Sequence, residues 1–204
     1  MHDPRAVLLQ HNSGLWSGCF LRFDGEGHEQ ERFPTELSVN ESKGLIQTSL
    51  TYKSTGQQRS MCFQNLPPSM QVCPKGGWSL GPTSITPWNW VAELCLVHRS
   101  ERRRIVVRHG VSGLDQVVYV VENADQHNPA VPTGPIQCHS RREGDLMIWQ
   151  PETGVELLLD PRDRQTGDAT ACGLRWSIGD GSVRQVVRRY DSNGNLLSLS
   201  PAWP

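Results

Sequence analysis

The sequence contains no long apolar run, and this absence excludes a membrane-spanning helix. Nowhere in its 204 residues do about 18 apolar residues follow one another, which is the least that a transmembrane helix needs. The apolar run near the amino terminus, residues 6–10, is also too short for the hydrophobic region of a signal peptide. We therefore expect a soluble, cytoplasmic protein with no membrane span.

Closely spaced cysteines are missing as well. The six cysteines include no C-x-x-C motif, the spacing that many metal and redox sites use. In a cytoplasm-like compartment thiols stay reduced, and an unpaired cysteine packs as a small apolar side chain. We expect free thiols at Cys19, Cys62, Cys73, Cys95, Cys138 and Cys172.

Lysine is scarce, with three lysines against 17 arginines, and acidic residues nearly balance the two together. The formal net charge of −1 argues against broad electrostatic capture of nucleic acid or of an anionic membrane. Three consecutive arginines, at 102–104, are interpreted as the solvated end of a hairpin, because no nucleic-acid recognition motif accompanies them. Nucleic acid is therefore not an expected partner.

The motifs of common catalytic and metal centres are also absent. No G-x-S-x-G elbow occurs, and none of the seven histidines forms an H-x-x-x-H or H-E-x-x-H pair. A cysteine and a histidine that meet only in space stay open, because such pairs are not adjacent in sequence. The sequence favours a protein that is not an enzyme and that holds no metal and no resident cofactor.

Helical periodicity is nearly absent, and only residues 4–13 predict a short helix. Elsewhere apolar and polar side chains alternate between turn residues, which is typical of an antiparallel barrel or sandwich. The pattern predicts an all-β fold of about ten strands in a single domain over residues 1–204. A proline-rich loop at 125–135 marks a weak internal boundary. The clearest strand segments are 15–24, 45–53, 91–98, 103–109 and 114–122.

Two stretches of the chain resemble a known family. They read LLQHNSGLWSGCFLRFDGEGHEQERFPTELSV and WNWVAELCLVHRSERRRIVVRHGVSGLDQVVYVVEN. In these stretches the chain resembles an uncharacterised lipocalin-like family of cyanobacteria and plastids. That family is similar to the chloroplast ATP synthase biogenesis factor and, more distantly, to the phycobiliprotein lyases. The first of the two stretches begins its strand with a G-x-W-x-G opening, Gly14 to Gly18. The resemblance implies a lipocalin-like (calycin) barrel that Trp16 closes at one end. An arginine, Arg188 or Arg189, is expected to lie across the indole ring.

The central hairpin carries the candidate ligand-binding residues. If residues 99–102 form its turn, Glu93 pairs with Arg108, and Arg104 and Tyr119 share their face. Two interpretations stay open. The face carries an ion pair in solvent, or it lies inside the barrel, where arginine binds a ligand carboxylate and the acids accept hydrogen bonds. The second interpretation suits a tetrapyrrole.

Three functions remain possible, and the absence of catalytic motifs places an enzyme last. The resemblance favours a non-enzymatic assembly or scaffolding factor for a photosynthetic or bioenergetic complex, with a protein of that complex as its partner. The alternative is a binder of a tetrapyrrole or another apolar ligand, such as a chromophore carrier similar to the phycobiliprotein lyases. An unrecognised enzyme is the third. A hollow interior lined with arginine and acids would favour ligand binding, and a packed interior would favour a scaffold.

Overall fold

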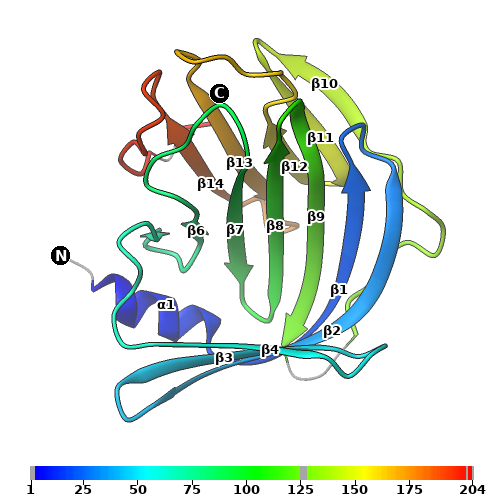
Figure 1. The fold of residues 1–204 in the computed structure, drawn as a ribbon. Helices are drawn as coiled ribbons and strands as arrows, with labels where there is room; N and C mark the ends of the chain where they lie inside the picture. The colour runs from blue at the N-terminus through cyan, green and yellow to red at the C-terminus, as the bar shows by residue number, and fades with distance from the viewer. Residues whose placement is uncertain (1–2, 125–127, 201, 204) are drawn as a thin grey trace.

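The computed structural model describes residues 3–124, 128–200 and 202–203. It begins with the helix α1 (Pro4–Asn12), as the sequence predicts (Figure 1). The Asp3 side chain caps this helix by accepting a hydrogen bond of 2.9 Å from the backbone N–H of Arg5. Pro4 stands in the first turn, where the missing N–H costs nothing. No helix in these ranges is long and apolar enough to cross a membrane.

Fourteen antiparallel strands form two sheets in the described part of the chain. The first sheet has the order β4-β3-β2-β1-β9-β8-β7-β6-β5, and the second has the order β10-β11-β12-β13-β14. The all-β class that the sequence predicts is therefore confirmed. The strands of the first sheet are β1 (Gly14–Asp24), β2 (Glu29–Ser42), β3 (Leu45–Tyr52), β4 (Gln58–Phe63), β5 (Gln71–Val72), β6 (Trp78–Leu80), β7 (Trp90–His98), β8 (Glu101–Gly110) and β9 (Gly113–Ala124). Those of the second are β10 (His139–Glu143), β11 (Leu146–Glu152), β12 (Val155–Leu159), β13 (Thr170–Ser177) and β14 (Val183–Tyr190).

The first sheet curls into a half-barrel (Figure 1). Its strands β7, β8 and β9 stand side by side in the middle of the molecule, and β1 and β2 continue the sheet toward β3 and β4. Strands β3 and β4 run across one end of the molecule, and α1 lies beside that end (Figure 1). Strands β13 and β14 of the second sheet contact β7. The architecture is thus a half-barrel covered by a second sheet, not one barrel with a continuous wall.

Alternating side chains of β7 and β8 fill the space between the two sheets. Leu94 and Ile105 are cross-strand partners there, and both are fully buried. They belong to one apolar cluster with Leu174 and Trp176 of β13, so the two sheets share a core. The opposite side chains of β7 and β8 point into the half-barrel, because successive residues of a strand face opposite sides of its sheet.

The turn between β7 and β8 is tighter than the sequence analysis expected. His98 pairs with Glu101, so the connection contains only Arg99 and Ser100, and the predicted turn at 99–102 is wrong. Arg99 has a positive φ of 55° and Ser100 does not, which is the pattern of a two-residue hairpin turn of type II′.

This turn changes the register of the whole hairpin. Glu93 pairs with Val106, and its predicted pairing with Arg108 is wrong. A shift of two residues keeps every side chain on its own face, because the side-chain period of a strand is two. Glu93 therefore still shares a face with Arg104, as its diagonal neighbour on the next strand.

A β-bulge between β8 and β9 changes the position of Tyr119. Beyond Arg108, the strand β9 has one residue more than β8, and Asp115 stands outside the pairing. The extra residue inverts the expected alternation, so Tyr119 pairs with Ile105 and lies on the core face. The prediction that Tyr119 shares a face with Glu93 is wrong for this reason.

Candidate ligand-binding site

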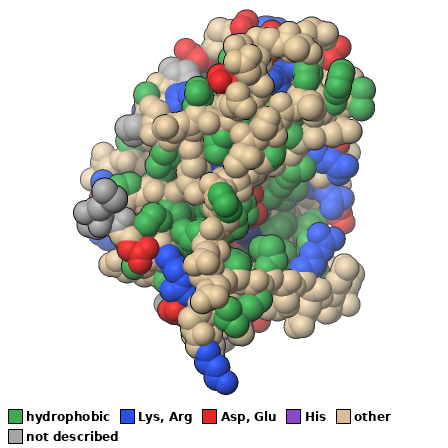
Figure 2. All heavy atoms as spheres, turned by 60° about the vertical axis from the view of Figure 1, so that its left-hand side comes forward, with side chains coloured by type: hydrophobic (Ala, Val, Ile, Leu, Met, Phe, Trp, Pro, Cys, Tyr) green, Lys and Arg blue, Asp and Glu red, His purple; other side chains and the backbone are tan. Residues whose placement is uncertain are grey.

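A cavity of about 460 Å³ lies between α1, the curled part of the first sheet and its central strands. Figure 2 shows a hollow on one face of the molecule with hydrophobic side chains on its walls. Most of the cavity wall is apolar, and each surrounding element contributes to it. Examples are Leu8 from α1, Leu37 from β2, Ile46 and Leu50 from β3, Trp78 from β6 and Val106 from β8.

One part of the cavity wall is charged. The side chains of Arg102 and Arg104 line it from β8, and Glu122 of β9 lies beside them, fully buried. Nε of Arg102 donates to Glu122 Oε2 at 2.7 Å. Arg104 donates to both carboxylate oxygens, from Nε at 2.9 Å and from Nη2 at 2.8 Å. One carboxylate thus holds two guanidinium groups, which are two residues apart on one strand face.

The electrostatics of this group follow from its geometry. Burial alone would raise the pKa of the Glu122 carboxyl, but the positive charges and hydrogen bonds of Arg102 and Arg104 lower it to about 2. Burial alone would lower the pKa of the Arg104 guanidinium, but the negative charges of Glu122 and Glu93 raise it. Glu122 and Arg104 are therefore both charged at neutral pH.

Glycine at position 18 makes room for the buried carboxylate. Gly18 lies on β1 opposite Glu122, and a Cβ atom there would stand 2.9 Å from Glu122 Cγ and 2.8 Å from Thr35 Oγ1. Both separations are too short for carbon and its neighbours to tolerate. The second glycine of the G-x-W-x-G opening is thus explained by close approach of β9 and not by a turn.

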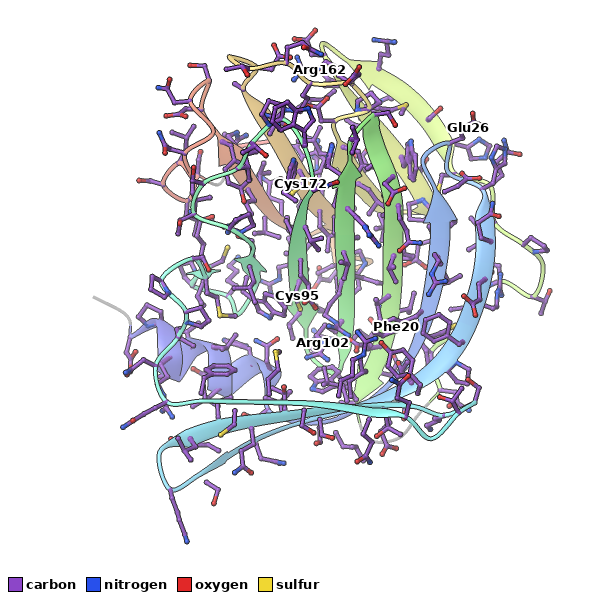
Figure 3. The ribbon with its side chains drawn as sticks, viewed as in Figure 1. Phe20, Glu26, Cys95, Arg102, Arg162 and Cys172 are labelled. Atoms are coloured by element: carbon purple, nitrogen blue, oxygen red, sulfur yellow. The ribbon has the colours of Figure 1, made fainter. Side chains whose placement is uncertain are left out.

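Aromatic rings of β1 cover the two arginines. The guanidinium carbon of Arg102 lies 4.2 Å from the ring centre of Trp16, and that of Arg104 lies 5.4 Å from the ring centre of Phe20. Figure 3 shows Arg102 and Phe20 in the half of the molecule nearer to the end that β3 and β4 cross. Arg102 Nη2 is buried and has no hydrogen-bond partner in the described part of the chain. Nη2 is thus a buried, unpaired donor on a side chain that lines the cavity.

Glu93 completes the charged group from the neighbouring strand. Its carboxylate accepts a hydrogen bond from Arg104 Nη1, and its side chain is 26% exposed, whereas that of Glu122 is completely buried. Glu93 and Arg104 both line the cavity. The structure therefore brings these two candidate residues together.

The other two candidate ligand residues lie elsewhere. Arg108 is 60% exposed and forms an ion pair with Asp115, with Nε 3.3 Å from Oδ2. Tyr119 lies between the sheets, where its hydroxyl donates to Glu152, which also accepts a 2.6 Å hydrogen bond from Arg103 Nε. Burial raises the pKa of the Tyr119 hydroxyl well above its usual range. Neither Arg108 nor Tyr119 lines the cavity.

The barrel-closing group predicted from the G-x-W opening is present in part. Trp16 is buried, as expected, and Gly14 at the start of β1 has a positive φ of 117°. The arginine across its ring is Arg102 of β8, where Arg188 or Arg189 was expected. Arg188 is instead buried on the face of β14 that is turned toward the first sheet, where it donates to Tyr190 Oη and to the carbonyl oxygens of Gly81 and Pro82.

Residues 4–127 match the model of the amino-terminal domain of DUF3598, a domain of unknown function. This chain belongs to the DUF3598 family. A crystal structure of a DUF3598 protein of unknown function from Nostoc punctiforme is similar to it, with a TM-score of 0.78 and 15% sequence identity. The similarity covers 98% of this chain and 97% of the other, and it shows a common fold. None of the curated proteins matches.

Sequence analysis of this DUF3598 protein missed two members of the charged group, Arg102 and Glu122. The arginine run at 102–104 was interpreted as a solvated hairpin end, but all three arginines are buried. The overlooked signal is the spacing of Arg102 and Arg104, which puts both on one strand face, together with an acid in the next predicted strand. In this DUF3598 structure no group of three or more His, Cys, Asp or Glu side chains that suits a metal ion occurs among the described residues.

Proposed function

We propose that this protein binds a small, mainly apolar molecule in the half-barrel cavity and acts as a non-enzymatic carrier or sensor of it. One observation carries the proposal: a cavity of about 460 Å³ has apolar walls and one group of buried, paired charges. Ligand sites of roughly 300–1,000 Å³ combine apolar walls with a few fixed polar groups in this way. The charged group can orient the ligand, while the walls supply most of the binding free energy.

The cavity favours a ligand binder, the alternative function, over the assembly factor that the resemblance favours. A packed interior was expected for a scaffold and a hollow one for a ligand binder, and the cavity supports the second. The assembly-factor function rests on sequence resemblance and stays a prediction. A tetrapyrrole is one ligand that the resemblance suggests, and it belongs in any ligand screen.

The experiment is a titration with N-phenyl-1-naphthylamine, an uncharged probe whose fluorescence rises in an apolar site. We expect saturable binding to the wild-type protein. The double variant Thr48→Trp/Leu50→Trp fills the cavity from β3, where both side chains line the wall. We expect it to weaken probe binding at least about tenfold, which corresponds to about 1.4 kcal/mol.

Ser49→Trp is the matched control, because it adds the same side chain to the same strand but on the opposite face. It should leave the affinity for the probe unchanged. Circular dichroism and urea unfolding show whether each variant is folded. No saturable binding by the folded wild-type protein, or equal loss in the control, would contradict the proposal.

A further inference from the structure

The charges beside the cavity are balanced before any ligand arrives. Arg102 and Arg104 supply two positive charges, and Glu122 and Glu93 supply two negative ones, all joined by direct hydrogen bonds. From this balance we infer that the cavity selects an uncharged amphiphile, an apolar molecule with a neutral acceptor such as a hydroxyl, carbonyl or ester, and discriminates against a carboxylate. The inference rests on the proposed function, since it names the ligand class of that site.

A carboxylate would disturb this group. Glu122 is fully buried and accepts three hydrogen bonds from the two guanidinium groups, so a ligand acid has no route to replace it. Glu93 occupies Arg104 Nη1. A ligand carboxylate would either compete with Glu93 or accept from Arg102 Nη2 and add a desolvated negative charge that no excess positive charge of the group balances, and burial of an uncompensated charge is strongly unfavourable.

A neutral acceptor meets the opposite situation. The Nη2 group of Arg102 is buried without a hydrogen-bond partner among the described residues, and its side chain lines the cavity. A buried donor left unpaired destabilises the protein, so an acceptor that reaches it recovers that loss. A hydroxyl or carbonyl oxygen can accept this hydrogen bond without changing the net charge of the group.

A third arginine, Arg59, lines the cavity and could bind a ligand carboxylate in place of the charged group. Arg59 of β4 is exposed, and its guanidinium lies 5.7 Å from the ring centre of Tyr52. Because solvent screens an exposed charge, Arg59 should attract a carboxylate only weakly compared with a buried, unpaired guanidinium. An acid that binds well would have to use it.

The experiment is displacement of bound N-phenyl-1-naphthylamine by ligands with one alkyl chain and different head groups: 1-decanol, decanoate and decylamine. At pH 8 the wild-type protein should bind decanol at least about tenfold more tightly than decanoate and decylamine. Decanoate binding as tight as that of decanol would overturn the inference while leaving the proposed function intact. Loss of that binding in Arg59→Gln would then place the acid at the exposed arginine.

Glu93→Gln tests whether charge balance is the cause. It removes one negative charge from a partly exposed position and leaves one guanidinium charge uncompensated, so the preference should move toward decanoate by at least about tenfold. Glu36→Gln is the matched control. Glu36 lies on β2 next to Leu37, which lines the cavity, but its own side chain does not line it. Its carboxylate lies 3.9 Å from Lys53 Nζ. This substitution should not change the preference.

If Glu93→Gln leaves the preference where it is in the wild-type protein, charge balance does not select the head group and the inference is wrong. If the probe itself does not bind the folded wild-type protein, the proposed function fails, and the inference fails with it. The two failures therefore give different results in the same assay.

Discussion

The guanidinium of Arg102 stacks on Trp16 at 4.2 Å from its ring centre and donates from Nε to Glu122 at 2.7 Å. One side chain thus joins the apolar end of β1 to the buried carboxylate of β9. Both Trp16 and Arg102 are almost completely buried. The contact links the integrity of the half-barrel to the charged group beside its cavity.

Replacement of Trp16 by alanine should lower the free energy of unfolding by about 3–5 kcal/mol. The change removes a buried indole and leaves the Arg102 guanidinium without its ring. Urea unfolding followed by circular dichroism measures the loss. Trp88→Ala is the control, because Trp88 is 54% exposed, and it should change stability by no more than about 0.5 kcal/mol. Equal losses in the two variants would show that Trp16 is not a core residue.

Replacement of Glu122 by glutamine should cost about 3–5 kcal/mol, because it leaves Arg102 and Arg104 buried without their shared counter-charge. Asp115→Asn is the comparison at a solvated ion pair, since Asp115 and its partner Arg108 are 54% and 60% exposed. It should cost less than about 1 kcal/mol. Denaturant midpoints at neutral pH separate the two cases, and similar small costs would argue against a charged Glu122.

His109 should make the protein less stable as the pH falls from about 6.5 to about 4. Its ring is buried and stacked on Trp90 at 4.3 Å, and burial lowers its pKa to about 4, below the ordinary value of 6.5. The unfolded chain therefore takes up a proton first, and the stability lost over this range amounts to at most about 3 kcal/mol. The pKa of Glu122, lowered to about 2, lies below this window.

Unfolding of the wild-type protein and of His109→Gln between pH 7 and pH 4 tests this pH dependence. The variant should lose the part of the pH dependence that comes from position 109. His139→Gln, at an exposed position, should keep the wild-type profile. An NMR titration in which the His109 imidazole protonates near pH 6.5 would contradict the prediction directly.

Alternation of side chains carried most of the successful predictions. Strands form over the predicted segments 91–98 and 103–109, and their apolar side chains, including Leu94 and Ile105, lie in the core, because a period of two is readable from sequence. The helix at residues 4–12 follows from Asp3 and Pro4 in the same local way. Asn193 and Gly194 lie in a local turn of the same kind, in which Gly194 N–H donates to Asp191 O at 2.9 Å. The next residues, Asn195 and Leu196, form two isolated bridges, with Ser84 and Tyr190, and not a strand.

Predictions that depended on counting residues across a turn did worse. The predicted partner of Glu93 is wrong because the turn has two residues, and the predicted face of Tyr119 is wrong because Asp115 is an extra residue in β9. Residues 99–102 contain no Gly or Asn that would mark a two-residue turn, so the local sequence does not choose the length of this turn. The arginine on Trp16 was misassigned for a related reason, since its partner is determined by which strands become neighbours.

The sequence by itself determined which side chains share a strand face: Arg102 with Arg104, and Trp16 with Gly18 and Phe20. That information is local, because it depends only on the geometry of an extended backbone. Only the tertiary structure decided that these faces meet around Glu122, beside a hollow and not in solvent. The first sheet curls around the charged group and the cavity, and the second sheet packs against the opposite face of the first. Both depend on contacts between residues far apart in the chain, which no local pattern encodes.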